Sequence, residues 1–197
     1  MLSTILSTFG IIFLVELPDK TALAALTLAT RYRSRDVIVG TFLAFLVQTV
    51  IAVLAGSLLT FLPNKPIHIA AGLGFLVFAI LALRHNDDDE TEKVKAEGFK
   101  LSRVNIVRKL PWLASFIIVF LAEWGDLSQL ATATLVARTG QPLAVGIGSL
   151  AGEWTVALLA VVLGLQVMRF INPFALKILS AILFAAVGIF MLVTALV

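Results

Sequence analysis

The sequence predicts an all-α integral membrane protein with six transmembrane helices, arranged as two inverted-topology repeats of three helices each. Three observations lead to this prediction. The 197 residues are 60% hydrophobic and only 14% charged, with a mean hydropathy of +1.04, whereas soluble domains are about one-quarter charged. Apolar segments of membrane-spanning length recur along the chain. The second half also repeats the polar pattern of the first. This composition excludes a soluble enzyme.

Charges and helix breakers delimit the six apolar segments. The N-terminus has no positive n-region and no clean cleavage site, so the first segment is expected to be a helix and not a signal peptide. The predicted helices are Leu2–Thr30, Val37–Leu62, Ile67–Leu83, Leu110–Ala137, Pro142–Phe170 and Pro173–Val197. The two repeats are therefore residues 1–83 and 110–197, joined by a charged linker at residues 84–109.

Positive charges predict the orientation of the chain. The first, third and fifth loops hold twelve lysines and arginines, and the opposite side holds only Lys65 and Arg138. Both termini are therefore expected outside, with the Arg84–Lys109 loop in the cytoplasm as a solvated linker. The net charge of +3 and pI near 9.5 fit loops that anchor the chain in lipid, and no nucleic-acid partner is expected. The compact length and the absence of a transit peptide indicate a bacterial plasma membrane.

The two halves of the chain align with each other without gaps. Placing Leu6–Arg31 on Leu113–Arg138 matches 12 of 26 positions identically. The informative matches are the polar ones, which pair Glu16 with Glu123, Asp19 with Asp126, Thr27 with Thr134 and Arg31 with Arg138, with Thr21 opposite Ser128. Because each half has an odd number of helices, the second half enters the membrane upside down, as in many secondary transporters.

Five carboxylates lie inside the predicted spans: Glu16, Asp19, Glu123, Asp126 and Glu153. One acid near a helix centre costs roughly 2.5–3.5 kcal/mol on insertion scales, so such residues normally line a polar pathway. The i, i+3 spacing within each repeated pair places both acids on one face of a continuous helix. Inverted symmetry is expected to bring the two pairs together near the midplane.

This arrangement suits a hard divalent cation. Oxygen ligands with high negative charge and no sulfur favour such ions, and the absence of cysteine excludes thiolate sites. Carboxylates packed closely disfavour one another's ionised form, so some of them can hold protons when no metal is bound. Additional ligands or pathway residues are expected among Thr21, Ser128, Gln129, Leu14, Glu153 and Gln48.

Backbone and charge details accompany the two acidic pairs. Pro18 cannot donate a hydrogen bond to the carbonyl of Leu14, which could then bind an ion or water. Gly125 holds the matching position in the second half and allows close backbone approach. Lys20 has no counterpart, because Leu127 lies opposite it, and we expect Lys20 to be a structural charge partner of a neighbouring acid.

The motifs ELPDKT at Glu16–Thr21 and EWGDLS at Glu123–Ser128 resemble the twin E-x-G-D-(K/R)-(S/T) signatures of a known family. This is the family of bacterial, chloroplast and Golgi cation/proton exchangers, catalogued as uncharacterised protein family sixteen or calcium:proton antiporter family two, which includes manganese exporters. The resemblance covers essentially the whole chain. It departs from the signature at Pro18, which replaces the glycine, and at Leu127, which replaces the basic residue.

The resemblance implies export of Mn2+, or in some members Ca2+, from the cytoplasm in exchange for protons. The metal ion is cargo, so no cofactor is expected. Carried over by position, the metal ligands are Glu16, Asp19, Glu123 and Asp126, with Thr21 and Ser128 as the hydroxyl positions.

Two alternatives of other classes stay open at this point. One is an intramembrane enzyme such as a polyprenyl-diphosphate phosphatase, although the spans offer Lys20 but no arginine or histidine near the acids and no Ser–His pairing for that chemistry. The other is a passive cation channel, which would keep the acidic ring without coupling to protons.

Overall fold

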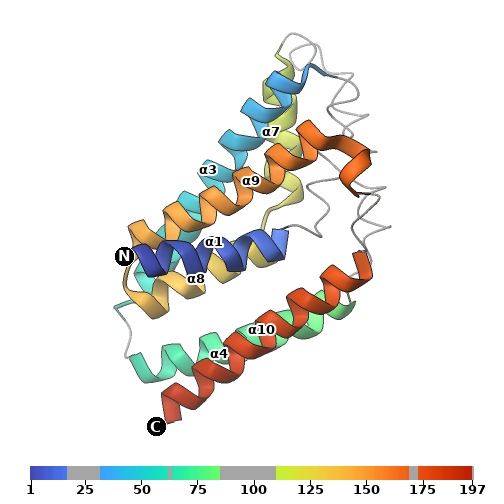
Figure 1. Cartoon of the computed structure of the whole chain (residues 1–197). Coiled ribbons are helices and arrows are strands. Elements are labelled where there is room, and N and C mark those ends of the chain that lie inside the picture. The colour runs from blue at the N-terminus through green and yellow to red at the C-terminus, as the bar shows by residue number, and fades with distance from the viewer. Residues whose placement is uncertain (17–31, 62–63, 85–109, 169–172, 197) are drawn as a thin grey trace.

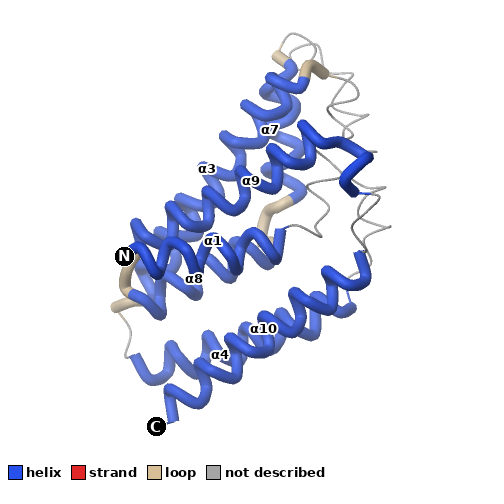
Figure 2. Tube along the Cα trace, viewed as in Figure 1, coloured by secondary structure: helices blue, strands red, loops and turns tan. Residues whose placement is uncertain are grey.

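Helices are the only regular secondary structure in the described part of the chain. The computed structural model describes residues 1–16, 32–61, 64–84, 110–168 and 173–196, while residues 17–31, 62–63, 85–109, 169–172 and 197 lie outside that description. The helices, drawn in Figure 2, are α1 (Leu2–Glu16), α3 (Ser34–Leu59), α4 (Asn64–Arg84), α7 (Pro111–Ala122), α8 (Leu127–Thr139), α9 (Pro142–Met168) and α10 (Pro173–Leu196). The prediction of an all-α fold is confirmed.

Four of the predicted helices correspond to single helices of the structure, namely α3, α4, α9 and α10. Their ends agree with the prediction to within three residues. The starts of α9 and α10 coincide with Pro142 and Pro173, and proline suits the first turn of a helix because its missing N–H needs no partner there. The first predicted helix, Leu2–Thr30, is described only as far as Glu16.

Two of the described helices are long and apolar enough to cross a membrane, judged by length and composition alone. They are α3 and the part of α9 from Pro142 to Val162, and the bent pair α7–α8 becomes a third if it counts as one span. Shorter apolar stretches occur in α1, α4 and α10. Large apolar side chains such as Leu58, Ile80 and Ile182 remain exposed on the outer surface, which suits contact with lipid.

The prediction of one continuous helix over Leu110–Ala137 is wrong. This segment forms α7 and α8, which are bent by 71° across a break at residues 123–126. At the break Gly125 has a φ of +76°, a conformation that glycine adopts readily because it has no Cβ atom. The expectation that Glu123 and Asp126 share one face of a single helix is therefore also wrong.

The helices form a bundle in which each half of the chain packs against the other. The long helices α3 and α9 pack together, α1 packs on α9, and α7 packs on α3 (Figure 1). Helix α8 contacts α3, α1 and α9, while α4 and α10 lie side by side along one edge of the bundle. This arrangement brings the end of α1 close to the break between α7 and α8.

Glycines permit the closest approaches between helices. A Cβ atom on Gly40 of α3 would fall on the backbone of Trp112 and Phe116 in α7. In the α4–α10 pair, a Cβ atom on Gly188 would lie 2.8 Å from the carbonyl oxygen of Gly72. Small residues are typical of such contacts between membrane helices.

We expect Gly40→Ala to destabilise the protein by roughly 1–3 kcal/mol, because the added methyl group would overpack the contact between α3 and α7. Gly74→Ala is the matched control, since a Cβ atom there meets nothing within 4 Å. Thermal unfolding of the two variants in detergent measures the difference. Equal unfolding temperatures would show that the α3–α7 contact tolerates a side chain at residue 40.

Candidate metal site

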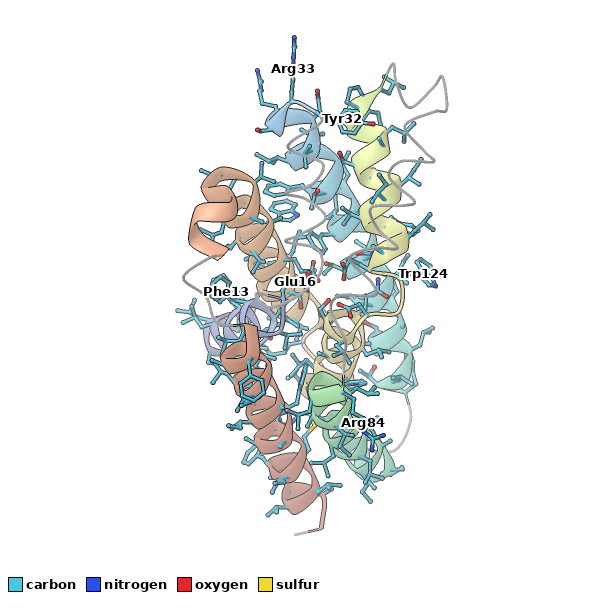
Figure 3. All side chains as sticks on the ribbon, turned by 90° about the vertical axis from the view of Figure 1, so that its right-hand side faces the viewer. Phe13, Glu16, Tyr32, Arg33, Arg84 and Trp124 are labelled. Atoms are coloured by element: carbon cyan, nitrogen blue, oxygen red, sulfur yellow. The ribbon has the colours of Figure 1, made fainter. Side chains whose placement is uncertain are left out.

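Helix α1 carries Glu16 into the interior of the bundle. Its side chain is fully buried (0% exposed), and Figure 3 shows it in the middle of the molecule. The neighbouring residues Ile12 and Val15 belong to the apolar core. A carboxylate in such surroundings is stable as an anion only when ions or hydrogen-bond donors compensate its charge.

Glu123 and Asp126 lie at the two ends of the break between α7 and α8. Glu123 follows the last residue of α7 and is 1% exposed. Asp126 precedes the first residue of α8 and is half-buried. A residue at this position lies at the positive end of the helix dipole, which stabilises a negative charge. The break thus places one acid in the interior and the other at a helix N-terminus.

These three acids converge on one point. One carboxylate oxygen from each of Glu16, Glu123 and Asp126 can be chosen so that all three lie within 4.8 Å of one another. A cation that binds oxygen at about 2.3–2.6 Å can span separations up to about 5 Å between its ligands. The group therefore has the spacing and the charge to bind a divalent ion.

Polar side chains of α8 surround the break. Ser128 is buried, and its hydroxyl donates to a carboxylate oxygen of Asp126 at 3.4 Å. The side-chain oxygen of Gln129 accepts a hydrogen bond from the backbone N–H of Gly125 at 3.1 Å. Ser128 thus lies beside a candidate ligand, whereas the oxygen of Gln129 already has a partner.

The other buried polar residues near the break come from α3 and α9. Glu153 is 2% exposed, and its carboxylate accepts a hydrogen bond from the hydroxyl of Thr49 at 2.7 Å. It also interacts electrostatically with Asp126. Gln48 is equally buried, and its amide nitrogen donates to the carbonyl oxygen of Phe120 at 2.9 Å.

Several predicted site residues lie outside the described part of the chain. Asp19, Lys20 and Thr21 all belong to residues 17–31. Leu14 is part of α1, but the role of its carbonyl depended on Pro18, which also lies in that range. The assignments of these residues stay predictions.

Sequence reasoning missed two features of the site. Thr49 was not selected, although a threonine beside a glutamine within an apolar helix is a signal that could have been followed. The break at residues 123–126 was missed because apolar segments flank it on both sides and no proline lies within it. Gly125 was the only local sign of the break, and glycine is also common within membrane helices.

The comparison with known families shows to which family the chain belongs. The family model described as divalent cation/proton antiporter GDT1 matches residues 4–90 and, separately, residues 111–197. The chain belongs to this family. Each match contains one of the two acidic motifs, so the predicted resemblance is confirmed. Membership in the GDT1 family makes the protein a cation transporter of the membrane and not an enzyme, which removes the phosphatase alternative.

Individual relatives extend this finding. A GDT1-like protein of Synechocystis sp. is 32% identical over 93% of this chain and 94% of its own length. Protein PAM71, chloroplastic, of Arabidopsis thaliana is 33% identical over 95% of this chain, which spans only 57% of that longer protein. GDT1-like protein 1, chloroplastic, of Oryza sativa is 30% identical, and the chain spans 59% of it. No solved structure matches the chain.

We expect Glu123→Gln to weaken Mn2+ binding by more than about tenfold, or 1.4 kcal/mol. The amide keeps the shape of the side chain but removes one charge from the cluster. Asp36→Asn is the matched control, because Asp36 lies in the first turn of α3 and outside the three-acid group. Calorimetric titration of the detergent-solubilised protein measures both. An unchanged affinity in Glu123→Gln and in Glu16→Gln would contradict the assignment of these acids as ligands.

Proposed function

We propose that the protein exports a divalent cation, Mn2+ or Ca2+, from the cytoplasm in exchange for protons. The observation that carries this proposal is the convergence of Glu16, Glu123 and Asp126, of which the first two are buried and the third is half-buried. Its members come from both segments that match the antiporter family model. Carboxylate oxygens are the ligands that Mn2+ and Ca2+ prefer.

The same group can hold protons in place of metal. Three anionic carboxylates this close repel one another, so binding of protons or of a divalent ion relieves the repulsion. A site that holds one or the other, but not both, couples their movements. Cytoplasmic metal would enter after protons leave, and external protons would displace it outward.

The first acidic motif is proposed to complete the site. In the alignment of the two halves, Asp19 and Thr21 correspond to Asp126 and Ser128. We infer that Asp19 is the fourth acidic ligand and that Thr21 contributes its hydroxyl. Lys20 then balances part of the negative charge while the site holds no metal.

The proposed inverted repeat has support from the packing. A Cβ atom on Gly40 of α3 would approach three residues of α7, namely Trp112, Ser115 and Phe116. One on Gly148 of α9 would approach three residues of α1, namely Ile5, Thr8 and Phe9. These two sets correspond one to one when the sequences of the two halves are aligned. In each half, the first helix therefore packs on the long helix of the other half. Such reciprocal packing is expected of two related halves that rock about a shared site.

The proposed orientation has both termini outside and the linker in the cytoplasm of a bacterial cell. Figure 1 shows both termini on the same side of the bundle as the end of α3, the start of α4 and the short connection from α8 to α9. The ends of α4 and α9 lie on the other side. In the sequence, the basic residues 84–109 follow the end of α4, and basic loops are favoured in the cytoplasm.

In proteoliposomes with a trapped pH dye, we expect addition of Mn2+ or Ca2+ to produce proton movement opposite to the metal. Mg2+ and Na+ serve as comparison ions. Glu123→Gln and Asp126→Asn should abolish this exchange, and Asp36→Asn should leave it intact. Metal entry without proton movement would instead indicate a passive channel, and full exchange in both site variants would overturn the proposed mechanism.

A further inference from the structure

The break between α7 and α8 releases several backbone polar groups from their helical partners, and two of them are the carbonyl of Phe120 and the N–H of Gly125. In an uninterrupted helix, the N–H of Trp124 would donate to Phe120 and the N–H of Gly125 would donate to Leu121. In the structure the N–H of Trp124 donates to the carbonyl of Leu121 at 3.4 Å. The carbonyl of Phe120 and the N–H of Gly125 therefore need other partners.

Two glutamine side chains supply those partners. The amide nitrogen of Gln48, on α3, donates to the carbonyl of Phe120 at 2.9 Å. The amide oxygen of Gln129, on α8, accepts from the N–H of Gly125 at 3.1 Å. Each side chain replaces one of the bonds that an uninterrupted helix would make.

The internal repeat supports this function for Gln129. In the alignment of the two halves, Gly125 corresponds to Pro18 and Gln129 corresponds to Ala22. Proline has no N–H to satisfy, and alanine has no oxygen to offer. Glutamine therefore occurs in the second half, where Gly125 has an N–H that needs a partner. The first half, where Pro18 has no N–H, has alanine at the corresponding position.

Losing either of these hydrogen bonds carries a large free-energy cost in a membrane protein. The bond from Gln48 is partly buried, and the bond from Gly125 to Gln129 lies at the exposed side of the break. At membrane depth no water can replace either bond, and a backbone group left without a partner there costs several kcal/mol. Without these glutamines, the segment would lower its energy by closing the gap between α7 and α8 or by fraying. Either change would move Glu123 and Asp126 relative to Glu16.

We propose that Gln48 and Gln129 are positioning residues that keep the helix broken and thereby hold Glu123 and Asp126 where one cation can bind both. The inference rests on the proposed function of this site. Gln48 lies in the first half of the chain and the break lies in the second. The bond from Gln48 therefore also ties the two halves together beside the metal site.

The first test measures backbone hydrogen exchange over residues 120–126 in the metal-free protein. We expect Gln48→Leu and Gln129→Leu to exchange several-fold faster than the unmodified protein, because the break opens more often. Gln129→Glu keeps an acceptor for the N–H of Gly125 and should exchange at the original rate. Ser57→Ala is the matched control, because the Ser57 hydroxyl also bonds to a backbone carbonyl of α3, that of Val53, away from the break.

The second test measures Mn2+ affinity by calorimetric titration of the same variants. Groups that orient metal ligands typically change metal affinity by 10–100-fold when removed, so both leucine variants should bind Mn2+ at least about tenfold more weakly. Weaker binding with unchanged metal-free exchange would overturn the proposal and make the glutamines direct ligands. Unchanged exchange and affinity would also overturn it. The exchange test needs no metal, so it stands even if the proposed transport function fails.

Discussion

Three converging carboxylates, two of them buried in an apolar helix bundle, are the constraint on which the rest of the structure depends. Glu16 and Glu123 cannot remain charged in such surroundings without compensation, and half-buried Asp126 adds a third negative charge beside them. Two features of the fold supply part of this compensation. The N-terminus of α8 lies at Asp126, and the break in the helix brings polar backbone into the interior. The same features leave room for a divalent ion to compensate the rest of the negative charge. The stability of the fold and the proposed transport therefore both depend on compensating the charge of these carboxylates.

The broken helix is itself possible only because other elements support it. Irregular backbone at membrane depth survives where it is enclosed by protein and its polar groups are satisfied. Helix α3 packs against both α7 and α8. The close approach of α3 to α7 and of α9 to α1 depends on Gly40 and Gly148. Tight packing by small residues and hydrogen bonding by the two glutamines therefore support the broken helix together.

Much of this architecture could be predicted from the sequence, because it depends on local patterns. Apolar runs bounded by charges and prolines located α3, α4, α9 and α10, and the internal repeat brought Glu16, Glu123 and Asp126 into one predicted site. The break at Gly125 could not be predicted in this way. It depends on Gln48, which lies in the other half of the chain, and on a glycine that looks ordinary in a membrane helix. The bond between Thr49 and Glu153 was missed for the same reason, since it joins residues of different halves.

The halves share their acids but not the surroundings of those acids. When the two halves are aligned, Lys20 lies opposite Leu127, Pro18 opposite Gly125, and Ala22 opposite Gln129. If the halves are inverted repeats, identical sequences would make the inward-facing and outward-facing states equivalent. Each difference near the acids instead favours one state over the other, and ligands shift a two-state equilibrium through their different affinities for the states. An exchanger that must load metal on one side and protons on the other benefits from this inequivalence. The departures from symmetry are therefore as much a part of the proposed mechanism as the repeated motifs.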